Sequence, residues 1–262
     1  MKISIIGAGR LATNLAPALQ KAGCELVEVW SKSQASAESL AALIGCKASW
    51  GRVEAATTEA DIYLICVKDS VLPEVVRCLH AGRESALFAH TAGSMSLSLF
   101  REVGHERGAV FYPMQTFSKQ RQVDFTRVHF FIETNVHEDE CVLTNLATRL
   151  SVRENVHYLT SAERRKLHLA AVFACNFANH CFALSDEILR SADIPFAAML
   201  PLIDETVRKL QDLPPREAQT GPAIRHDDNV IGLQRAMLLD QPGLLAVYDS
   251  LTRSIQELGL DN

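Results

Sequence analysis

The 262-residue sequence lacks several features that identify common classes of protein. It has no long run of lysine and arginine, and its net charge is −5, so we expect no nucleic-acid partner. The first apolar run ends after a few residues, which is too short for a secretory leader. We find no uncharged stretch that approaches the length of a membrane span, and we expect no membrane partner.

Cysteine pairs and metal-binding motifs are also missing. The seven cysteines are scattered, no C-x-x-C occurs, and Cys66 and Cys175 lie in apolar runs typical of buried reduced thiols. A cytoplasmic location is consistent with this usage. Histidine and cysteine show no metal-ligand spacing, so we predict no metal.

A glycine-rich turn is the most informative motif that is present. Residues 7–12 are Gly-Ala-Gly-Arg-Leu-Ala and follow the apolar run Lys2–Ile6. This G-x-G-x-x-A pattern, between a predicted strand and a predicted helix, is typical of a dinucleotide-binding turn. The free N–H groups of such a helix attract a pyrophosphate. We predict that five residues of this turn bind the cofactor: Gly7, Ala8, Gly9, Arg10 and Leu11.

Residues 1–159 alternate between strand-like and helix-like segments. The apolar run Asp61–Val67 is typical of a strand buried on both faces. Such alternation predicts an α/β fold with a doubly wound, parallel, helix-covered sheet, which is a Rossmann domain. Val53–Ala60 is predicted as a short helix, and Val128–Glu133 and Val152–Leu159 as edge strands.

From Thr160 onward we find helices and no convincing strand, which predicts an all-helical second domain over residues 160–262. A long helix is expected to run from Thr160 or Ser161 to about Ser191. Its stretch Leu167–Leu184 is nearly apolar all round, which implies burial on every side. A partner subunit would explain such burial, so we expect a homodimer formed by the helical domain.

The end of the second predicted strand bears on which dinucleotide binds. A protein that binds NAD usually has a carboxylate there for the ribose 2′-hydroxyl. This chain has Ser31, Lys32 and Ser33 instead, and Glu28 lies inside the strand. Hydroxyls and a cation suit a 2′-phosphate, and Arg10 adds a second cation, so NADP is the expected cofactor. The alternative is that Ser31–Ser33 is a polar loop at the start of the next helix.

Val67, Lys68 and Asp69 follow the central strand. Ligands of open α/β sheets bind at the carboxyl ends of the strands, which predicts cofactor contacts for these three residues. Asp69 and Ser70 are equally suited to cap the helix that follows.

Three further segments resemble those of one family. They are residues 90–94 (His-Thr-Ala-Gly-Ser), 112–117 (Tyr-Pro-Met-Gln-Thr-Phe) and 220–227 (Thr-Gly-Pro-Ala-Ile-Arg-His-Asp). With the glycine turn, they resemble the Rossmann-like NADP oxidoreductases that carry a C-terminal domain of unknown function 2520. This family is part of the 6-phosphogluconate dehydrogenase-like superfamily, together with ketopantoate and pyrroline-5-carboxylate reductases. The resemblance covers almost the whole chain, and it implies no particular substrate.

The chain departs from that family at two positions, with Tyr112 where a histidine is usual and His226 where a glycine is common. The superfamily resemblance also implies a proton donor on the first long helix of the helical domain, where a lysine is frequent. His168 takes the place of that lysine, and Asn176 the place of an asparagine that some members use for substrate. We therefore predict His168 and Asn176 as catalytic residues.

Lys166 is the alternative proton donor. Imidazole exchanges protons near neutral pH, whereas a lysine does so only when burial favours its neutral form. The alternative without catalysis is that His168 is a hydrogen-bonded histidine of the core.

Small residues after the fifth strand leave room for a ligand, and we predict three substrate-binding residues: His90, Thr91 and Gln115.

Two functions are consistent with these motifs. The first is an NADP-dependent oxidoreductase that transfers a hydride between NADP(H) and a small carbonyl, imine or hydroxy acid. The second is a protein that binds NADP as a sensor or partner without turnover. An open polar cleft lined by His90, Gln115 and His168 would favour the enzyme. The motifs after residue 160 speak against a true pyrroline-5-carboxylate reductase.

Overall fold

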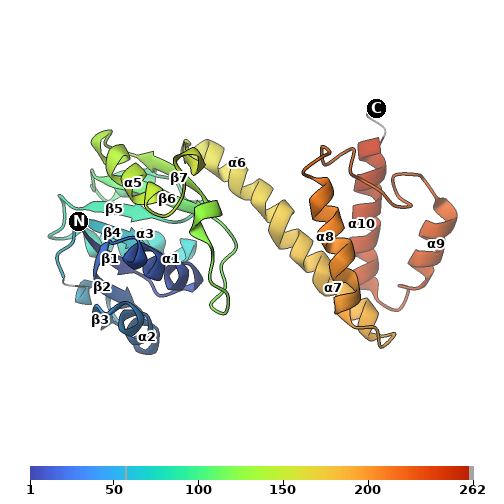
Figure 1. The fold of residues 1–262 in the computed structure, drawn as a ribbon, viewed down its shortest axis with the longest axis horizontal. Coiled ribbons are helices and arrows are strands. Elements are labelled where there is room, and N and C mark those ends of the chain that lie inside the picture. Colours follow the sequence, from blue (N-terminus) through green and yellow to red (C-terminus); the bar gives the residue numbers. More distant parts are fainter. Residues whose placement is uncertain (57, 260–262) are drawn as a thin grey trace. The chain divides into compact units, whose positions relative to one another are not determined.

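The chain forms two units, which we describe separately from a computed structural model that covers residues 1–56 and 58–259 (Figure 1). The first unit runs from Met1 to Cys175, and the second begins at Asn176. The first is an α/β unit and the second is helical, which confirms the predicted fold class.

The first unit is built on an eight-stranded sheet with the order β3-β2-β1-β4-β5-β6-β7-β8. All neighbouring strands pair in parallel except β6 and β7. The strands are β1 (Lys2–Ile6), β2 (Glu25–Ser31), β3 (Lys47–Trp50), β4 (Ile62–Ile65), β5 (Leu87–His90), β6 (Gly108–Met114), β7 (His129–Thr134) and β8 (Val156–Tyr158). The chain turns back at β1, whose neighbours are β2 and β4, and such a reversal point is where open sheets bind ligands.

Helices cover both faces of this sheet and divide its core into two layers. On one face, apolar residues of α1 (Arg10–Lys21), α2 (Gln34–Ile44) and α5 (Glu138–Thr148) pack on the strands. On the other, α3 (Leu72–His80) and the short α4 (Ser98–Glu102) do the same. Every side chain of β4 is buried because it lies between the two layers, as its apolar run predicted.

The far side of the sheet differs from the prediction in two respects. β7 is antiparallel to β6, and it is an interior strand because β8 pairs with its other side. The segment between β6 and β7 contains only the one-turn helix η3 (Phe125–Arg127), whereas a parallel connection usually contains a crossover α-helix. The prediction of an edge strand at Val128–Glu133 was therefore wrong.

The predicted short helix at Val53–Ala60 was also too long. Residue 57 lies outside the described residues, and among the others of this segment only Val53–Ala55 forms a 3₁₀ turn, η1. Two backbone carbonyls in this segment accept hydrogen bonds from side chains rather than from helical N–H groups. Arg83 donates to the Ala56 carbonyl, and the Tyr63 hydroxyl donates to the Thr58 carbonyl. The remaining one-turn helices are η2 (Asp69–Val71), η4 (Arg153–Asn155) and η6 (Phe196–Met199).

The long helix predicted from residue 160 is present but has three parts. They are α6 (Ser161–Ala171), the π-helical segment Val172–Phe177 and α7 (Ala178–Arg190). Thr160 and Glu163 begin α6 with a reciprocal capping box. The π-helical segment contains both Cys175 and Asn176, so it spans the change from the first unit to the second.

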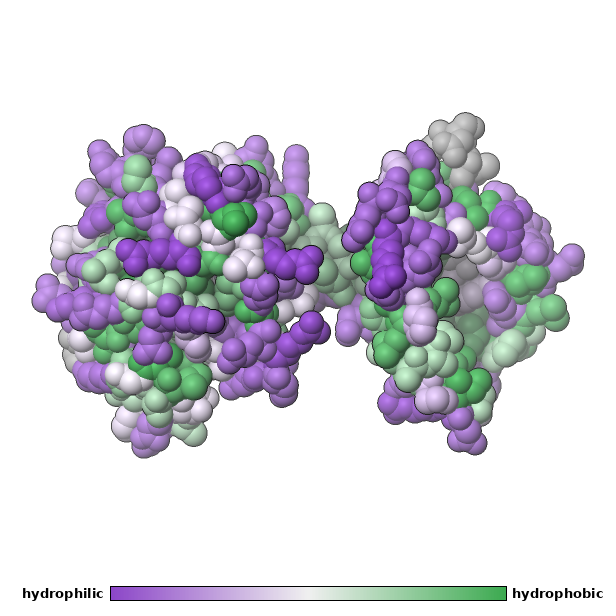
Figure 2. Space-filling view, in the orientation of Figure 1, coloured by the Kyte–Doolittle hydropathy of each residue, from purple (hydrophilic) through white to green (hydrophobic). Residues whose placement is uncertain are grey.

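The second unit continues with α8 (Leu200–Lys209), α9 (Asp228–Ala236) and α10 (Pro242–Gly259). α9 and α10 are joined by polar contacts, in which Arg235 binds Asp249 and Tyr248 donates to Gln234. Green areas in Figure 2 show apolar side chains at the surface of this unit. Leu202, Leu233 and Met237 are among its exposed apolar residues.

One prediction about the long helix stays open and another needs correction. Leu167–Leu184 is not buried within the single chain, where Leu169 is 58% exposed, so its predicted burial against a partner subunit stays a prediction. Ser161–Arg190 is also long and apolar enough to cross a membrane by length and composition, contrary to our statement that no such stretch exists. Core helices of soluble proteins pass the same test, so this observation alone assigns no membrane.

Candidate functional site

The predicted site residues of the first unit gather at one edge of the sheet. β1, β2, β4, β5 and β6 all run in the same direction, so the loops after them lie at their common carboxyl edge. These loops contain the glycine turn and the segments 31–33, 67–69, 90–94 and 115–116. This is the position where open α/β sheets bind their ligands.

The glycine turn has the features of an anion site. Gly7 has φ +118°, and a Cβ there would lie 2.5 Å from the Cys66 carbonyl oxygen, so only glycine fits. Gly9 is the N-cap of α1, no side chain caps the helix, and its first turn holds no acidic residue. A Cβ on Gly9 would have one neighbour within 4 Å, the same Cys66 oxygen at 3.9 Å, so there is room for a ligand beside Gly9. The uncapped N–H groups of α1 are therefore available to a phosphate.

Three cationic side chains around this turn are exposed. The side chains of Arg10, Lys32 and Lys68 form no hydrogen bond or ion pair within residues 1–56 and 58–259. Ser33 caps α2 through the Ser36 N–H group, so the capping interpretation of this loop is correct for Ser33 and compatible with a nucleotide site. Glu28 does not act as a ribose ligand in this structure, because it is fully buried and lies 3.0 Å from the Lys47 ammonium group.

The loop after β4 is linked to the loop after β5. The Ser94 hydroxyl donates a hydrogen bond to the Asp69 carboxylate. No side chain caps η2 or α3, so Asp69 and Ser70 do not form the predicted helix cap. Val67 is half-buried, and its neighbours Lys68 and Asp69 are exposed at the carboxyl edge.

His168 of α6 lies against these loops. The Tyr112 hydroxyl is 3.2 Å from His168 Nδ1, and the two rings meet edge to face. A Cβ at Gly93 would come within 2.6 Å of Nδ1, so the absence of a side chain there admits the imidazole. Burial raises the pKa of Tyr112, which keeps the phenol in its neutral form.

The two candidate proton donors lie in different environments. Lys166 is exposed and two residues before His168, about 200° away around the helix. His168 is half-buried and contacts Tyr112. Asn176 is exposed and belongs to the second unit, so its predicted role stays a prediction.

The predicted substrate residues are placed unequally. Gln115 is exposed beside a cavity of about 600 Å³ formed by residues 115–127, and its side chain accepts a bond from the Thr116 N–H group. His90 is fully buried, and its Nδ1 accepts a hydrogen bond from the Ala92 N–H group. Thr91 donates to the Ile65 carbonyl. The burial of His90 and Thr91 argues for a role in shaping the loop rather than in contacting a ligand.

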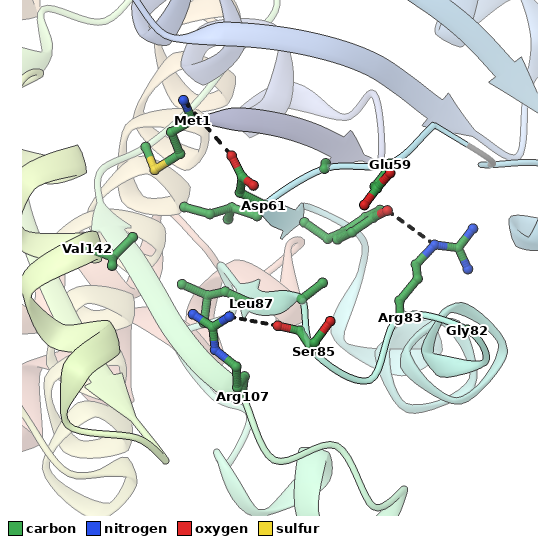
Figure 3. Close-up of a pocket in the computed structure, with 13 residues that line it drawn as sticks. Met1, Glu59, Asp61, Gly82, Arg83, Ser85, Leu87, Arg107 and Val142 are labelled. Atoms are coloured by element: carbon green, nitrogen blue, oxygen red, sulfur yellow. Dashed lines mark hydrogen bonds and ion pairs between the residues drawn. The ribbon is translucent and has the colours of Figure 1, made fainter.

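A second hollow lies at the opposite, amino edge of the sheet (Figure 3). It measures about 410 Å³ and is lined by Asp61, Arg83 and Arg107 among others. Arg83 is already bonded to Tyr63 and to backbone carbonyls, and Arg107 is bonded to Asp139 and Ser85. Because their donors are occupied, these arginines are structural and do not form an anion site. No group of three or more metal-ligating side chains occurs among the residues that the structure covers.

Sequence reasoning missed three contributors to the site. Tyr112 was noted only as a departure from the family, and Gly93 only as a small residue. Arg164, four residues before His168, was not identified. An i, i+4 spacing to His168 was the one available signal for Arg164, because helical residues four apart share a face.

Comparison with known proteins agrees with this arrangement. A model described as "NADP oxidoreductase coenzyme F420-dependent" matches residues 2–88, and "Domain of unknown function (DUF2520)" matches residues 128–255. A crystal structure of a putative NADP oxidoreductase from Bacteroides fragilis shares 47% identity over 98% of each chain, with a TM-score of 0.91. The chain belongs to this NADP oxidoreductase family.

More distant structures share the fold of the family. A protein from Thermotoga maritima is 22% identical over 98% of this chain and 99% of its own, with a TM-score of 0.79. An imine reductase from Myxococcus stipitatus in complex with NADP⁺ is 18% identical over 98% and 93%, with a TM-score of 0.71. No curated protein matches the sequence. The predicted resemblance and the prediction of NADP for this family are confirmed.

The buried imidazole of His90 makes the stability of this NADP oxidoreductase depend on pH. Burial and, to a smaller extent, the Arg164 guanidinium lower the pKa of His90 to about 3. Unfolded histidine has a pKa of about 6.5, so between about pH 6.5 and 3 only the unfolded chain takes up this proton. Stability contributed by neutral His90 is therefore present above pH 6.5 and is lost as the pH falls.

We predict that His90→Gln flattens the pH dependence of the free energy of unfolding between pH 6 and 4. The loss of one differential proton corresponds to about 1.4 kcal/mol per pH unit. Urea unfolding at several pH values measures this slope. His137→Gln is the matched control, because His137 is 89% exposed and its contact with Glu140 is a surface ion pair of the kind that contributes little, so its removal should change the slope far less than His90→Gln does. An unchanged slope in His90→Gln would contradict the burial of its neutral imidazole.

Proposed function

We propose that this protein is an NADP-dependent reductase or dehydrogenase of a small carbonyl, imine or hydroxy-acid substrate, with His168 as the proton donor. The observation that carries the proposal is the placement of His168 against Tyr112 and Gly93, at the sheet edge that also holds the glycine turn. Bound NADPH supplies the hydride of such a reaction. The protein has to bind the cofactor, orient the acceptor and provide a proton.

The residues at the carboxyl edge suit the parts of NADP. The uncapped N-terminus of α1 and Gly9 would hold the pyrophosphate. Arg10, Lys32 and the Ser31 hydroxyl would hold the 2′-phosphate, since the two cations are exposed and no carboxylate competes for them at the end of β2. Val67, Lys68 and Asp69 would border the cofactor at the end of β4.

His168 is suited to pass a proton to the acceptor. Its Nδ1 is engaged by the Tyr112 hydroxyl, which leaves Nε2 as the nitrogen that can meet a substrate. A general acid at the reacting atom contributes about 10²- to 10⁴-fold to a rate. Gln115 is proposed to orient the substrate. The imine reductase in complex with NADP⁺, which shares this fold, supports this substrate class.

The cofactor assignment predicts that Lys32→Ala and Arg10→Ala each weaken NADPH binding by about tenfold, because each removes a charged contact worth about 1.4 kcal/mol to the 2′-phosphate. NADH binding should change by less than about twofold. Quenching of intrinsic fluorescence measures both affinities. Lys21→Ala, at the other end of α1, is the control with no expected effect. Equal losses for NADPH and NADH would exclude recognition of the 2′-phosphate by these residues.

The catalytic assignment is tested once a substrate is found by screening 2-keto acids, aldehydes and cyclic imines with NADPH. We predict that His168→Ala lowers kcat by about 10²- to 10⁴-fold because the general acid is lost, while the Kd for NADPH stays unchanged. Lys166→Ala should retain wild-type kcat. The reverse outcome, with Lys166→Ala inactive and His168→Ala active, would overturn the assignment.

We also propose a homodimer formed through the helical elements. Many large apolar side chains of α6 to α10 are exposed, with Leu202 at 63% and Leu233 at 71%. Exposed apolar area of this extent is unusual for a monomer.

For this dimer, sedimentation should give twice the mass of 28.9 kDa for the wild type. Leu169→Asp should shift the protein toward the monomer because it places a charge on the apolar helix. Leu43→Asp on α2 is the matched control, since Leu43 and Leu169 are both 58% exposed. A wild-type monomer would refute the proposal.

A further inference from the structure

Arg164 is the most deeply buried cation among the residues that the structure covers, with 1% exposure. Its guanidinium forms an ion pair with Glu133 of β7 and donates to the Met95 carbonyl in the loop after β5. It also lies 3.3 Å from the Ser161 hydroxyl at the start of α6. A buried charge is costly unless it is paired and hydrogen-bonded, and here three separate segments supply its partners.

The same partners fix the loop after β5 against α6. The Ser161 hydroxyl accepts a hydrogen bond of 3.0 Å from the Leu97 N–H group, and both Ser161 N–H and O–H donate to Glu133. Met95 and Leu97 are thus held from the first turn of α6. Gly93 lies two residues before Met95, so its position depends on this anchorage.

Gly93 and Tyr112 enclose the imidazole of His168. A Cβ on Gly93 would lie 2.6 Å from His168 Nδ1 and 2.9 Å from Tyr112 Cζ, so the three residues are in direct contact. Within residues 1–56 and 58–259, His168 Nδ1 is the one partner within hydrogen-bond distance of the neutral Tyr112 hydroxyl. When the hydroxyl donates, Nδ1 accepts and the hydrogen of neutral His168 resides on Nε2, which is the arrangement that leaves a donor for a substrate.

We propose that Arg164 is a positioning residue that holds the loop 92–97 against α6, so that Gly93 and Tyr112 keep His168 in one orientation with its hydrogen on Nε2. Arg164 and His168 are four residues apart and share a face of α6. Release of Met95 would let Gly93 move away from the imidazole and free its rotation. The inference rests on the proposed function for its catalytic meaning, but the orientation of His168 can be measured without turnover.

The experiment compares Arg164→Gln with wild type by ¹⁵N NMR of the histidine rings, recorded well above the pKa of free imidazole. His168→Gln identifies the signals of His168. Wild type should show the Nε2–H tautomer alone, and Arg164→Gln should show a mixture of both tautomers. With a substrate in hand, kcat should fall by about 100-fold, as for a misplaced catalytic group, while the Kd for NADPH changes by less than about twofold.

Three further variants make the result specific. Arg165→Ala is the matched control, because Arg165 is the exposed neighbour of Arg164, and it should behave as wild type. Arg164→Lys should give an intermediate tautomer ratio, since a single ammonium group cannot match the fork that joins Glu133 to Met95. If Arg164→Gln fails to fold, Glu133→Gln tests the same anchorage, because it keeps an acceptor for Ser161 but removes the charge opposite Arg164.

An unchanged His168 tautomer in folded Arg164→Gln or Glu133→Gln would overturn the positioning role. A change of tautomer combined with full activity of His168→Ala would instead contradict the proposed function and leave the positioning of the ring intact. The two failures are thus distinguishable.

Discussion

The meeting of three strands at the glycine turn is the constraint on which the rest of the structure depends. The Gly7 N–H group bonds to the Trp30 carbonyl of β2 at 2.7 Å, and the Cys66 N–H group bonds to the Ile6 carbonyl of β1 at 2.7 Å. Gly7 is pressed so closely to Cys66 that a side chain there would clash with backbone. This contact lets the chain leave β1 sharply and begin α1 with uncapped N–H groups. The carboxyl edge of the sheet is therefore left accessible next to β1, where the strand order reverses.

Polar groups inside this unit serve to place loops around that edge. Asn14 of α1 donates to the Ser118 carbonyl and accepts from the Val123 N–H group, which ties the loop after β6 to α1. His90 braces the loop after β5 from inside, and Arg164 holds it from α6. Buried polar groups are costly unless they are bonded, so each of these contacts also specifies one arrangement of its loop. The loops that would surround a cofactor and a substrate are therefore held by the interior of the unit.

The sequence predicted the elements better than it predicted the environment of individual side chains. The apolar runs of β1 and β4 and the glycine turn were recognised because their patterns are local. The direction of β7 was missed, since it depends on whether a crossover helix intervenes and on pairing with β6. His90 was expected to face a ligand from its place at a strand end. Only the packing of Phe100 and the loop after β5 around its ring shows that it is buried.

Spacing and residue type by themselves determined a dinucleotide-binding α/β unit, the absence of a carboxylate at the end of β2 and the change to helices after residue 160. These features depend on residues that are close together in the sequence. The spacing of apolar residues and the positions of glycines therefore show them directly. Tertiary structure decided which polar residues meet. It brought Tyr112 of β6 to His168 of α6, and Glu133 of β7 to Arg164, across separations of 56 and 31 residues. Such pairings are set by how strands and helices pack, which no local pattern encodes.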